Sequence, residues 1–321
     1  MKNPNKLVMS DLHLGNHQQF AGISKDGINT RLLLQHNAIQ KAMQTGVKRD
    51  CKILVIAGDI FHVRGLVEVE AVNVFHDILK EAEELFENIY IITGNHDITH
   101  ENTQMFNTLN VFSEHKNVKI IDPKSSVTYQ DMKTVFFGYT NDTEYINDEL
   151  KYFDDAEKYD LYCHQAIFGV QYRNHVLTEG VELKYLKRFK RVFNGHIHEP
   201  KKLSYSIYNL GSLVPMDFGD VGERYYYVIS DNKVEKFQSD HPLFITVKSP
   251  KDVRKDNFYR VVSDKLIETG DNVKLVINKK LMFDRGVDYS NHVSVIESYC
   301  KNIKHEDMAK SGLLLFKEAN A

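Results

Sequence analysis

Short apolar runs, each the length of one buried strand, recur through the first two hundred or so residues of this 321-residue chain. They are rich in β-branched and aromatic residues, which favour strands over helices in runs this short. In chain order they are Leu7–Met9, Ile53–Ala57, Ile89–Thr93, Val118–Ile121, Thr134–Phe137, Leu161–Cys163 and Arg191–Phe193. A chain with this pattern must place most of its strands in sheets whose faces are covered.

Amphipathic helical patterns separate the first three of these runs. Arg31–Met43 carries apolar residues at helical spacing, and Val67–Leu85 repeats them at i, i+3, i+4 and i+7. Strands that alternate with helices form a sheet of parallel strands with helices packed on it. The sequence therefore predicts an α/β fold.

The second half of the chain predicts hairpins and a domain boundary. Ser206–Leu210, Tyr225–Ser230 and Lys233–Phe237 are expected to be adjacent antiparallel strands, with a turn at Asp231-Asn232. A break falls near Ser239-Asp240-His241-Pro242, so we predict one domain over residues 1–239 and a second over 240–321. The second domain is expected to contain strands and one helix, at Phe244–Val247, Phe258–Val262, Asn272–Ile277 and Ser290–Lys301.

Polar residues suited to metal binding follow five of the predicted strands. They are Asp11 and His13, then Asp59 and His62, then Asn95, His96 and Asp97, then His164, and finally His196 and His198. The carboxyl ends of parallel strands converge on one edge of a sheet, where open α/β folds place their sites. Side chains spread over nearly 190 residues can therefore meet in one cleft.

Carboxylate, imidazole and amide ligands without thiolate suit Mn²⁺, iron or zinc. An Asp between two such ions can bridge them, and two ions about 3.5–4 Å apart can hold both the attacking and the leaving oxygen of a phosphoester. Gly58, Gly94 and Gly195 each precede a predicted ligand, where a side chain would crowd the site. The pattern predicts a two-metal phosphoesterase.

Composition excludes several other classes of protein. Cys51, Cys163 and Cys300 lie far apart without a Cys-x-x-Cys pair, which argues for a reducing compartment and against a thiolate zinc site. The net charge of −3 excludes a general polyanion binder. No apolar run approaches the roughly 18 residues of a membrane span, so we expect a cytoplasmic protein without membrane association.

The five motifs resemble those of the calcineurin-like metallophosphoesterase superfamily. Asp-x-His, Gly-Asp, Gly-Asn-His-Asp, a lone His and Gly-His-x-His stand in that order from Asp11 to His198. His62 three residues after Asp59, Asp97 in place of Glu, and Gly211-Ser212 followed by Phe218-Gly219-Asp220 are similar to the SbcD-type branch, the nuclease subunit of double-strand-break repair. The compact length resembles bacteriophage members, which serve recombination and replication.

This resemblance implies a fold and a role for each site residue. The fold would be a β-sandwich flanked by helices, with a small α+β capping domain at the carboxy terminus. One metal would be held by Asp11, His13 and His198, the other by Asn95, His164 and His196, with Asp59 bridging them. His96 would protonate or stabilise the departing oxygen, His62 would orient the phosphate or His96, and Asp97 would be structural.

The resemblance also implies substrates and partners. It predicts a Mn²⁺-dependent 3′→5′ exonuclease on duplex DNA ends and an endonuclease on single strands, in a bacterial or phage-infected cytoplasm. Homodimerisation is expected through helices at Val67–Leu85 and about Glu101–Phe112. An SMC-like coiled-coil ATPase of the SbcC type would bind the carboxy-terminal segment, of which only Ile303–Ala321 is present.

Two other functions fit parts of the same sequence. A phosphatase or cyclic-nucleotide phosphodiesterase would hydrolyse small phosphoesters, ignore DNA and have little use for the residues after 240. A DNA-end-binding or scaffolding subunit would bind metal without cutting any phosphoester, and the intact set of ligands argues against it.

Overall fold

The structure, a computed structural model, describes residues 3–100, 103–173, 175–263 and 270–277. The chain divides into two compact units, Met1–Ile245 with Lys255–Phe258, and Thr246–Arg254 with Tyr259–Ala321. The helix predicted at Ser290–Lys301 and the segment Ile303–Ala321 lie outside the described residues.

The first sheet has six strands and contains the predicted parallel arrangement. Its order is β16 (Val234–Gln238), β15 (Tyr225–Ile229), β1 (Asn5–Met9), β2 (Cys51–Ala57), β3 (Asn88–Ile92) and β6 (Val118–Ile121). Strands β1, β2, β3 and β6 run parallel, while β15 is antiparallel to both β1 and β16. The alternation of strands and helices and the β15–β16 hairpin are therefore confirmed.

The second sheet also has six strands. Its order is β13 (Lys201–Lys202), β14 (Ile207–Asn209), β12 (Arg191–Asn194), β9 (Asp160–Cys163), β8 (Thr134–Phe137) and β7 (Ser126–Tyr129). Strand β14 pairs with β12 in parallel, so the prediction that it lies beside β15 is wrong. The reason is that residues 210–224 carry the chain from this sheet to the first one, a step that local pattern cannot reveal.

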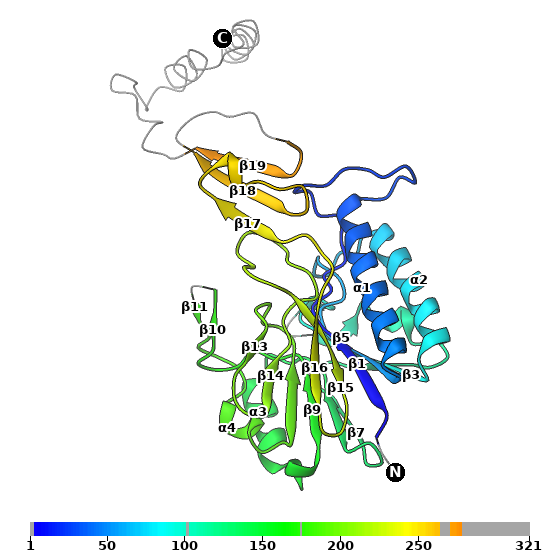
Figure 1. The fold of residues 1–321 in the computed structure, drawn as a ribbon. Coiled ribbons are helices and arrows are strands. Elements are labelled where there is room, and N and C mark those ends of the chain that lie inside the picture. The colour runs from blue at the N-terminus through cyan, green and yellow to red at the C-terminus, as the bar shows by residue number, and fades with distance from the viewer. Residues whose placement is uncertain (1–2, 101–102, 174, 264–269, 278–321) are drawn as a thin grey trace, which may run out of the picture. The chain divides into compact units, whose positions relative to one another are not determined.

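The two sheets pack face to face through an aromatic core. Tyr90 stacks on Phe136 at 4.5 Å between ring centroids, and Tyr162 stacks on Phe136 and Phe193 at 5.4 and 4.9 Å. These side chains alternate along their strands with others that face the helices, as a period of two requires. The result is a β-sandwich, as the resemblance implies (Figure 1).

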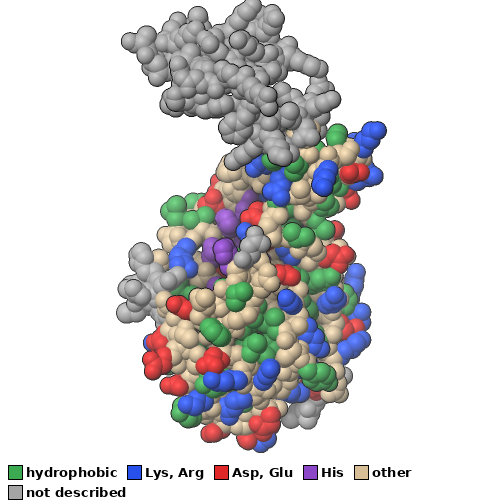
Figure 2. Space-filling view, turned by 90° about the vertical axis from the view of Figure 1, so that its left-hand side faces the viewer, with side chains coloured by type: hydrophobic (Ala, Val, Ile, Leu, Met, Phe, Trp, Pro, Cys, Tyr) green, Lys and Arg blue, Asp and Glu red, His purple; other side chains and the backbone are tan. Residues whose placement is uncertain are grey.

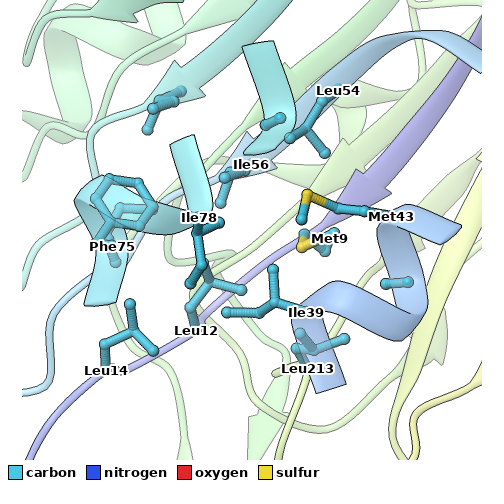
Figure 3. Close-up of a cluster of buried hydrophobic side chains, with 14 of the residues drawn as sticks. Met9, Leu12, Leu14, Ile39, Met43, Leu54, Ile56, Phe75, Ile78 and Leu213 are labelled. Atoms are coloured by element: carbon cyan, nitrogen blue, oxygen red, sulfur yellow. The ribbon is translucent and has the colours of Figure 1, made fainter. Parts of the chain in front are cut away.

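Helices cover the outer face of each sheet. On the first lie α1 (Thr30–Lys48) and α2 (Val69–Leu85), and on the second lie α3 (Thr143–Tyr152) and α4 (Leu183–Leu186). Figure 3 shows Ile39 and Met43 of α1 and Phe75 and Ile78 of α2 against strand residues such as Ile56. The predicted fold class, an α/β sandwich flanked by helices, is confirmed.

The helix predicted at Glu101–Phe112 is wrong over its described part. Strands β4 (Ile98–His100) and β5 (Thr103–Asn107) form an antiparallel hairpin, followed by a short 3₁₀ helix at Asn110–Phe112. The Asn107 side chain accepts a hydrogen bond from the backbone N–H of Leu109 at 3.0 Å. Such a local side-chain bond stabilises a turn in competition with a helix.

The second unit contains most of a three-stranded sheet in the order β17 (Phe244–Val247), β18 (Phe258–Ser263) and β19 (Val273–Ile277), in which β18 and β19 are parallel. Two short strands of the first unit, β10 (Gln171–Tyr172) and β11 (His175–Val176), form a separate hairpin. Within the described ranges, no helix has the length and apolar character needed to cross a membrane.

The packing of α2 on the first sheet predicts a large stability effect for Phe75→Ala. Phe75 is fully buried and contacts the rings of Phe61 and Phe112. We expect the free energy of unfolding to fall by about 3–5 kcal/mol, because a buried cavity is left behind. Lys80→Ala, on the exposed side of α2, should change it by less than about 0.5 kcal/mol. Urea denaturation of both variants measures this, and a loss below about 1 kcal/mol for Phe75→Ala would contradict the packing described.

Candidate metal centre

The structure brings the predicted site residues together beyond the carboxyl ends of their strands. Parallel pairing continues past β1 and β2, since the backbone N–H groups of Asp11 and His13 donate to the carbonyls of Gly58 and Asp59, both at 3.0 Å. The other predicted residues follow β3, β9 and β12, namely Asn95, His96, His164, His196 and His198. Figure 2 shows histidine side chains gathered in one place on the surface of the protein.

One group of potential ligands consists of Asp11, His13 and His198. The Nε2 atoms of the two histidines lie 3.0 Å apart, and Nε2 of His198 is 4.0 Å from Oδ1 of Asp11. All three ligand atoms lie within 4.8 Å of one another. Asp11 and His13 are buried, so the group is shielded from bulk water on most sides.

A second group consists of Asn95, His164 and His196. The Oδ1 atom of Asn95 lies 3.1 Å from Nε2 of His164 and 2.8 Å from Nδ1 of His196. The Nδ1–H group of His164 donates to the carbonyl of Ala57 at 2.7 Å, so Nε2 is the nitrogen that faces the site. This hydrogen bond therefore determines that Nε2, not Nδ1, is the nitrogen of His164 that could bind a metal ion.

Asp59 lies between the two groups. Its Oδ2 atom is 3.6 Å from Nε2 of His13, and its Oδ1 atom is 3.4 Å from Nε2 of His164. Although burial raises it, the facing imidazoles of His164 and His13 hold the pKa of this carboxyl well below its ordinary range. Each oxygen of an ionised carboxylate therefore faces a different ligand group.

The charges of the buried groups fit a bound cation. Burial lowers the pKa of His13 well below its ordinary value, and burial with the neighbouring His164 lowers that of His196 to about 3, so both are neutral ligands at physiological pH. Against the effect of burial, Asp59 and Asp11 raise the pKa of His164 to about 9. Burial raises the pKa of Asp11, so its ionised form needs positive charge beside it, which divalent ions would supply.

Several candidate ligands have strained backbone conformations. Asp11, His13, Asp59 and His196 have φ angles of 50°, 46°, 53° and 76°, in the left-handed region that most residues avoid. Strain of this kind concentrates at functional sites, where the surrounding fold imposes it. A Cβ atom on Gly94 would overlap Oδ1 of Asp59, which confirms the predicted need for glycine there.

His96 and His62 lie beside these groups. The Nδ1–H group of His96 donates to the backbone carbonyl of His62 at 2.6 Å, and the ring of His96 lies 4.8 Å from that of His13. The backbone carbonyl of His62 thus holds the ring of His96, while the ring of His62 packs 4.4 Å from the ring of His17.

Asp97 joins the loops after β2 and β3. Its carboxylate accepts hydrogen bonds from the backbone N–H groups of Asp59 and Ile60, both at 3.0 Å, and of Gly94 at 2.8 Å. The side chain is fully buried and holds the Asp59 loop against the loop that carries Asn95 and His96. This arrangement agrees with the structural role predicted for Asp97.

Two residues near the site had no predicted role. Asp220 contacts the Nδ1 atom of His198 at 3.3 Å, and Nε2 of His17 lies 3.1 Å from the carbonyl oxygen of His13. His17 follows the Asp-x-His motif by four residues, and Asp220 belongs to the Phe218-Gly219-Asp220 segment noted above. Neither directly follows a strand, so the rule that found the other residues could not select them.

The backbone hydrogen bonds to the Asp97 carboxylate predict that Asp97→Ala destabilises the protein. Each buried N–H left without a partner costs about 1–3 kcal/mol. We expect a loss of at least about 2 kcal/mol in the free energy of unfolding, whereas Asp131→Ala in an exposed turn should have almost no effect. Denaturation is measured in chelator, so that lost metal binding does not contribute. Equal stability of the two variants would exclude this role.

Comparisons with known proteins agree with this geometry. The family model of the calcineurin-like phosphoesterases matches residues 5–200, which hold all five motifs. Protein 244L of Invertebrate iridescent virus 6, named as a phosphoesterase, is 28% identical over 178 residues, which cover 53% of this chain and 61% of that protein. Exonuclease subunit 1 of Enterobacteria phage T4 is 21% identical over 234 residues, which cover 72% of this chain and 65% of that protein.

This chain thus spans less than two thirds of the length of either relative. The crystal structure of the Pseudomonas putida nuclease MPE aligns with a TM-score of 0.32 and 14% identity, over 72% of this chain and 87% of that one. A likeness that weak bears on neither activity nor substrate. The family match covers well over half of the chain, and the chain belongs to the calcineurin-like phosphoesterase family.

Proposed function

We propose that this chain is a two-metal, Mn²⁺-dependent DNA nuclease subunit of the SbcD type. The observation that carries the proposal is the position of Asp59, whose two oxygens face His13 at 3.6 Å and His164 at 3.4 Å. A carboxylate so placed can bridge two ions.

Each of the two groups of side chains would bind one of the two ions. Asp11, His13 and His198 would hold one ion, and Asn95, His164 and His196 the other. Carboxylate, imidazole and amide donors without thiolate suit Mn²⁺. When bound, the pair would supply a nucleophile at neutral pH and neutralise charge on the phosphoester.

His96 is proposed as the group that protonates or stabilises the departing oxygen. Its Nδ1–H is held by the carbonyl of His62, so the ring orientation is fixed and Nε2 remains available for proton transfer. One ring nitrogen of His96 lies within 4.8 Å of a ring nitrogen of His13 and of a carboxylate oxygen of Asp59. His62 assists by orienting His96.

DNA is the proposed substrate because of the motifs that distinguish the nuclease branch. His62 stands three residues after Asp59, and Asp97 follows Gly-Asn-His. The relative from phage T4, which bears an exonuclease name, aligns over 72% of this chain. The finer activities, 3′→5′ exonuclease on duplex ends and endonuclease on single strands, rest on the resemblance to that branch.

Partners are proposed on the same basis. A homodimer would use the side of α2 and the 3₁₀ segment, where Leu66, Val69 and Val111 are each at least 70% exposed. The residues after 240 would cap the DNA. An SMC-like coiled-coil ATPase would bind the carboxy-terminal segment, in a bacterial or phage-infected cytoplasm where recombination and repair take place.

The substrate is tested by offering purified full-length protein several phosphoesters with Mn²⁺. Linear duplex DNA and circular single-stranded DNA should be cut, with or without a coiled-coil ATPase from the same genome, and phosphate monoesters should be poor substrates. Rapid monoester hydrolysis with intact DNA would instead support a phosphatase. If the protein binds metal stoichiometrically but cuts no phosphoester, even when the ATPase is present, a scaffolding subunit would be supported.

His96→Ala should lower the rate of DNA cleavage by about 10²–10⁴-fold, the usual contribution of a positioned acid. Metal content, measured by mass spectrometry after desalting, should not change. His36→Ala is the matched control, since His36 lies on α1 and contacts no candidate ligand among the described residues. Undiminished cleavage by His96→Ala would remove this residue from the mechanism.

Asp59→Ala and Asn95→Ala should differ in how many of the two metal sites lose affinity. Because Asp59 faces both groups, its loss should weaken binding of both ions, whereas loss of Asn95 should weaken one. Calorimetric titration with Mn²⁺ counts the sites, and electron paramagnetic resonance detects coupling between neighbouring ions. Two ions bound with unchanged affinity in Asp59→Ala would contradict the bridging role.

A further inference from the structure

Asp220 is a buried carboxylate in the loop between β14 and β15, and the proposed mechanism does not use it. Its side chain is 3% exposed. One oxygen, Oδ2, accepts from the Met216 backbone N–H at 2.9 Å and lies 3.3 Å from Nδ1 of His198. The other, Oδ1, lies 3.0 Å from the guanidinium of Arg173 and 3.9 Å from that of Arg224.

The contact with His198 determines which nitrogen of that ring faces the candidate metal centre. A neutral imidazole carries one N–H, and Asp220 as an acceptor favours the hydrogen on Nδ1. The lone pair is then on Nε2, which lies 3.0 Å from Nε2 of His13 and 4.0 Å from Asp11. A carboxylate behind a metal-binding histidine fixes the tautomer and the ring plane, and its loss usually costs 10–100-fold in affinity.

The β10–β11 hairpin holds Asp220 and His198 from the other side. Arg173, next to β10, donates to Asp217 at 3.1 Å and to Asp220 at 3.0 Å through the same nitrogen. The neighbouring Tyr172 presents its ring to that of His198 in an edge-to-face contact at 5.9 Å between centroids. The hairpin thus contributes to both the charge around Asp220 and the packing of His198.

We propose that Asp220 is a positioning residue for His198, held in place by Arg173, and that it raises affinity for the ion of the Asp11, His13 and His198 group. The proposal rests on the two-ion site of the proposed function. The loop between β14 and β15 should therefore affect the binding of this ion directly and leave the other ion unaffected. Among the described residues, Asp220 contacts none of Asn95, His164 and His196, the candidate ligands of the other ion.

The experiment compares Asp220→Ala with Asp217→Ala. Both carboxylates contact Arg173, but Asp217 is 48% exposed and its hydrogen bonds go to Arg173 and Gly219 rather than to His198. Calorimetric titration of the full chain with Mn²⁺ should show one of two sites weakened 10–100-fold in Asp220→Ala and neither weakened in Asp217→Ala. Unchanged affinities, or an equal loss at both sites, would overturn the proposal.

A second measurement needs no metal. The ¹⁵N shifts of the His198 ring in metal-free protein, recorded at a pH high enough for the ring to be neutral, should report hydrogen on Nδ1 in the wild type and a mixture of tautomers in Asp220→Ala. If that variant does not fold, Asp220→Leu, which has a similar size but no hydrogen-bond acceptor, takes its place. Hydrogen on Nε2 in the wild type, or the same shifts in the variant, would overturn the proposal. Wild-type protein that binds no Mn²⁺ would refute the proposed function, while the tautomer would still decide the role of Asp220.

Discussion

The candidate site depends on two carboxylates, Asp11 and Asp59, that are removed from water at the edge of the first sheet. An isolated buried carboxylate is strongly unfavourable, so the fold must surround it with positive charge or hydrogen-bond donors. Each oxygen of Asp59 faces an imidazole. In addition, the backbone N–H of His96 donates a hydrogen bond to Asp59, and the backbone N–H of His196 donates one to Asp11. The arrangement of the histidines follows from this requirement, and it also makes the site suitable for divalent cations.

The backbone provides the second constraint. Four candidate ligands have positive φ angles, and Gly94 allows its loop to approach Asp59 closely. Such conformations persist only where the rest of the fold over-determines them. Here the parallel pairing of β1, β2 and β3 sets the starting points of the loops, and the Asp97 carboxylate bonds two of those loops to each other.

The sandwich explains why the ligands come from both halves of the first unit. The first sheet provides the loops that carry Asp11, Asp59 and Asn95, and the second provides those of His164 and His196. The aromatic core between the sheets fixes the distance between the two sets of loops, since close-packed rings leave little room for the sheets to shift. A rigid base of this kind suits a site whose ligands must be placed to within a fraction of an ångström.

Local pattern in the sequence determined the strands that lead to the candidate ligands (β1, β2, β3, β9 and β12), the first two helices and the strand-end positions of those ligands. These features depend on the period of apolar residues and on which polar residues follow each run, and both are readable along the chain. Tertiary structure alone decided the rest. It placed β14 beside β12 rather than beside β15, and it formed a hairpin from β4 and β5 where a helix was predicted. It also brought Asp220 behind His198 and Asp97 under the Asp59 loop. These outcomes depend on contacts between segments distant in sequence, whose packing and hydrogen-bonding energies local propensity does not contain.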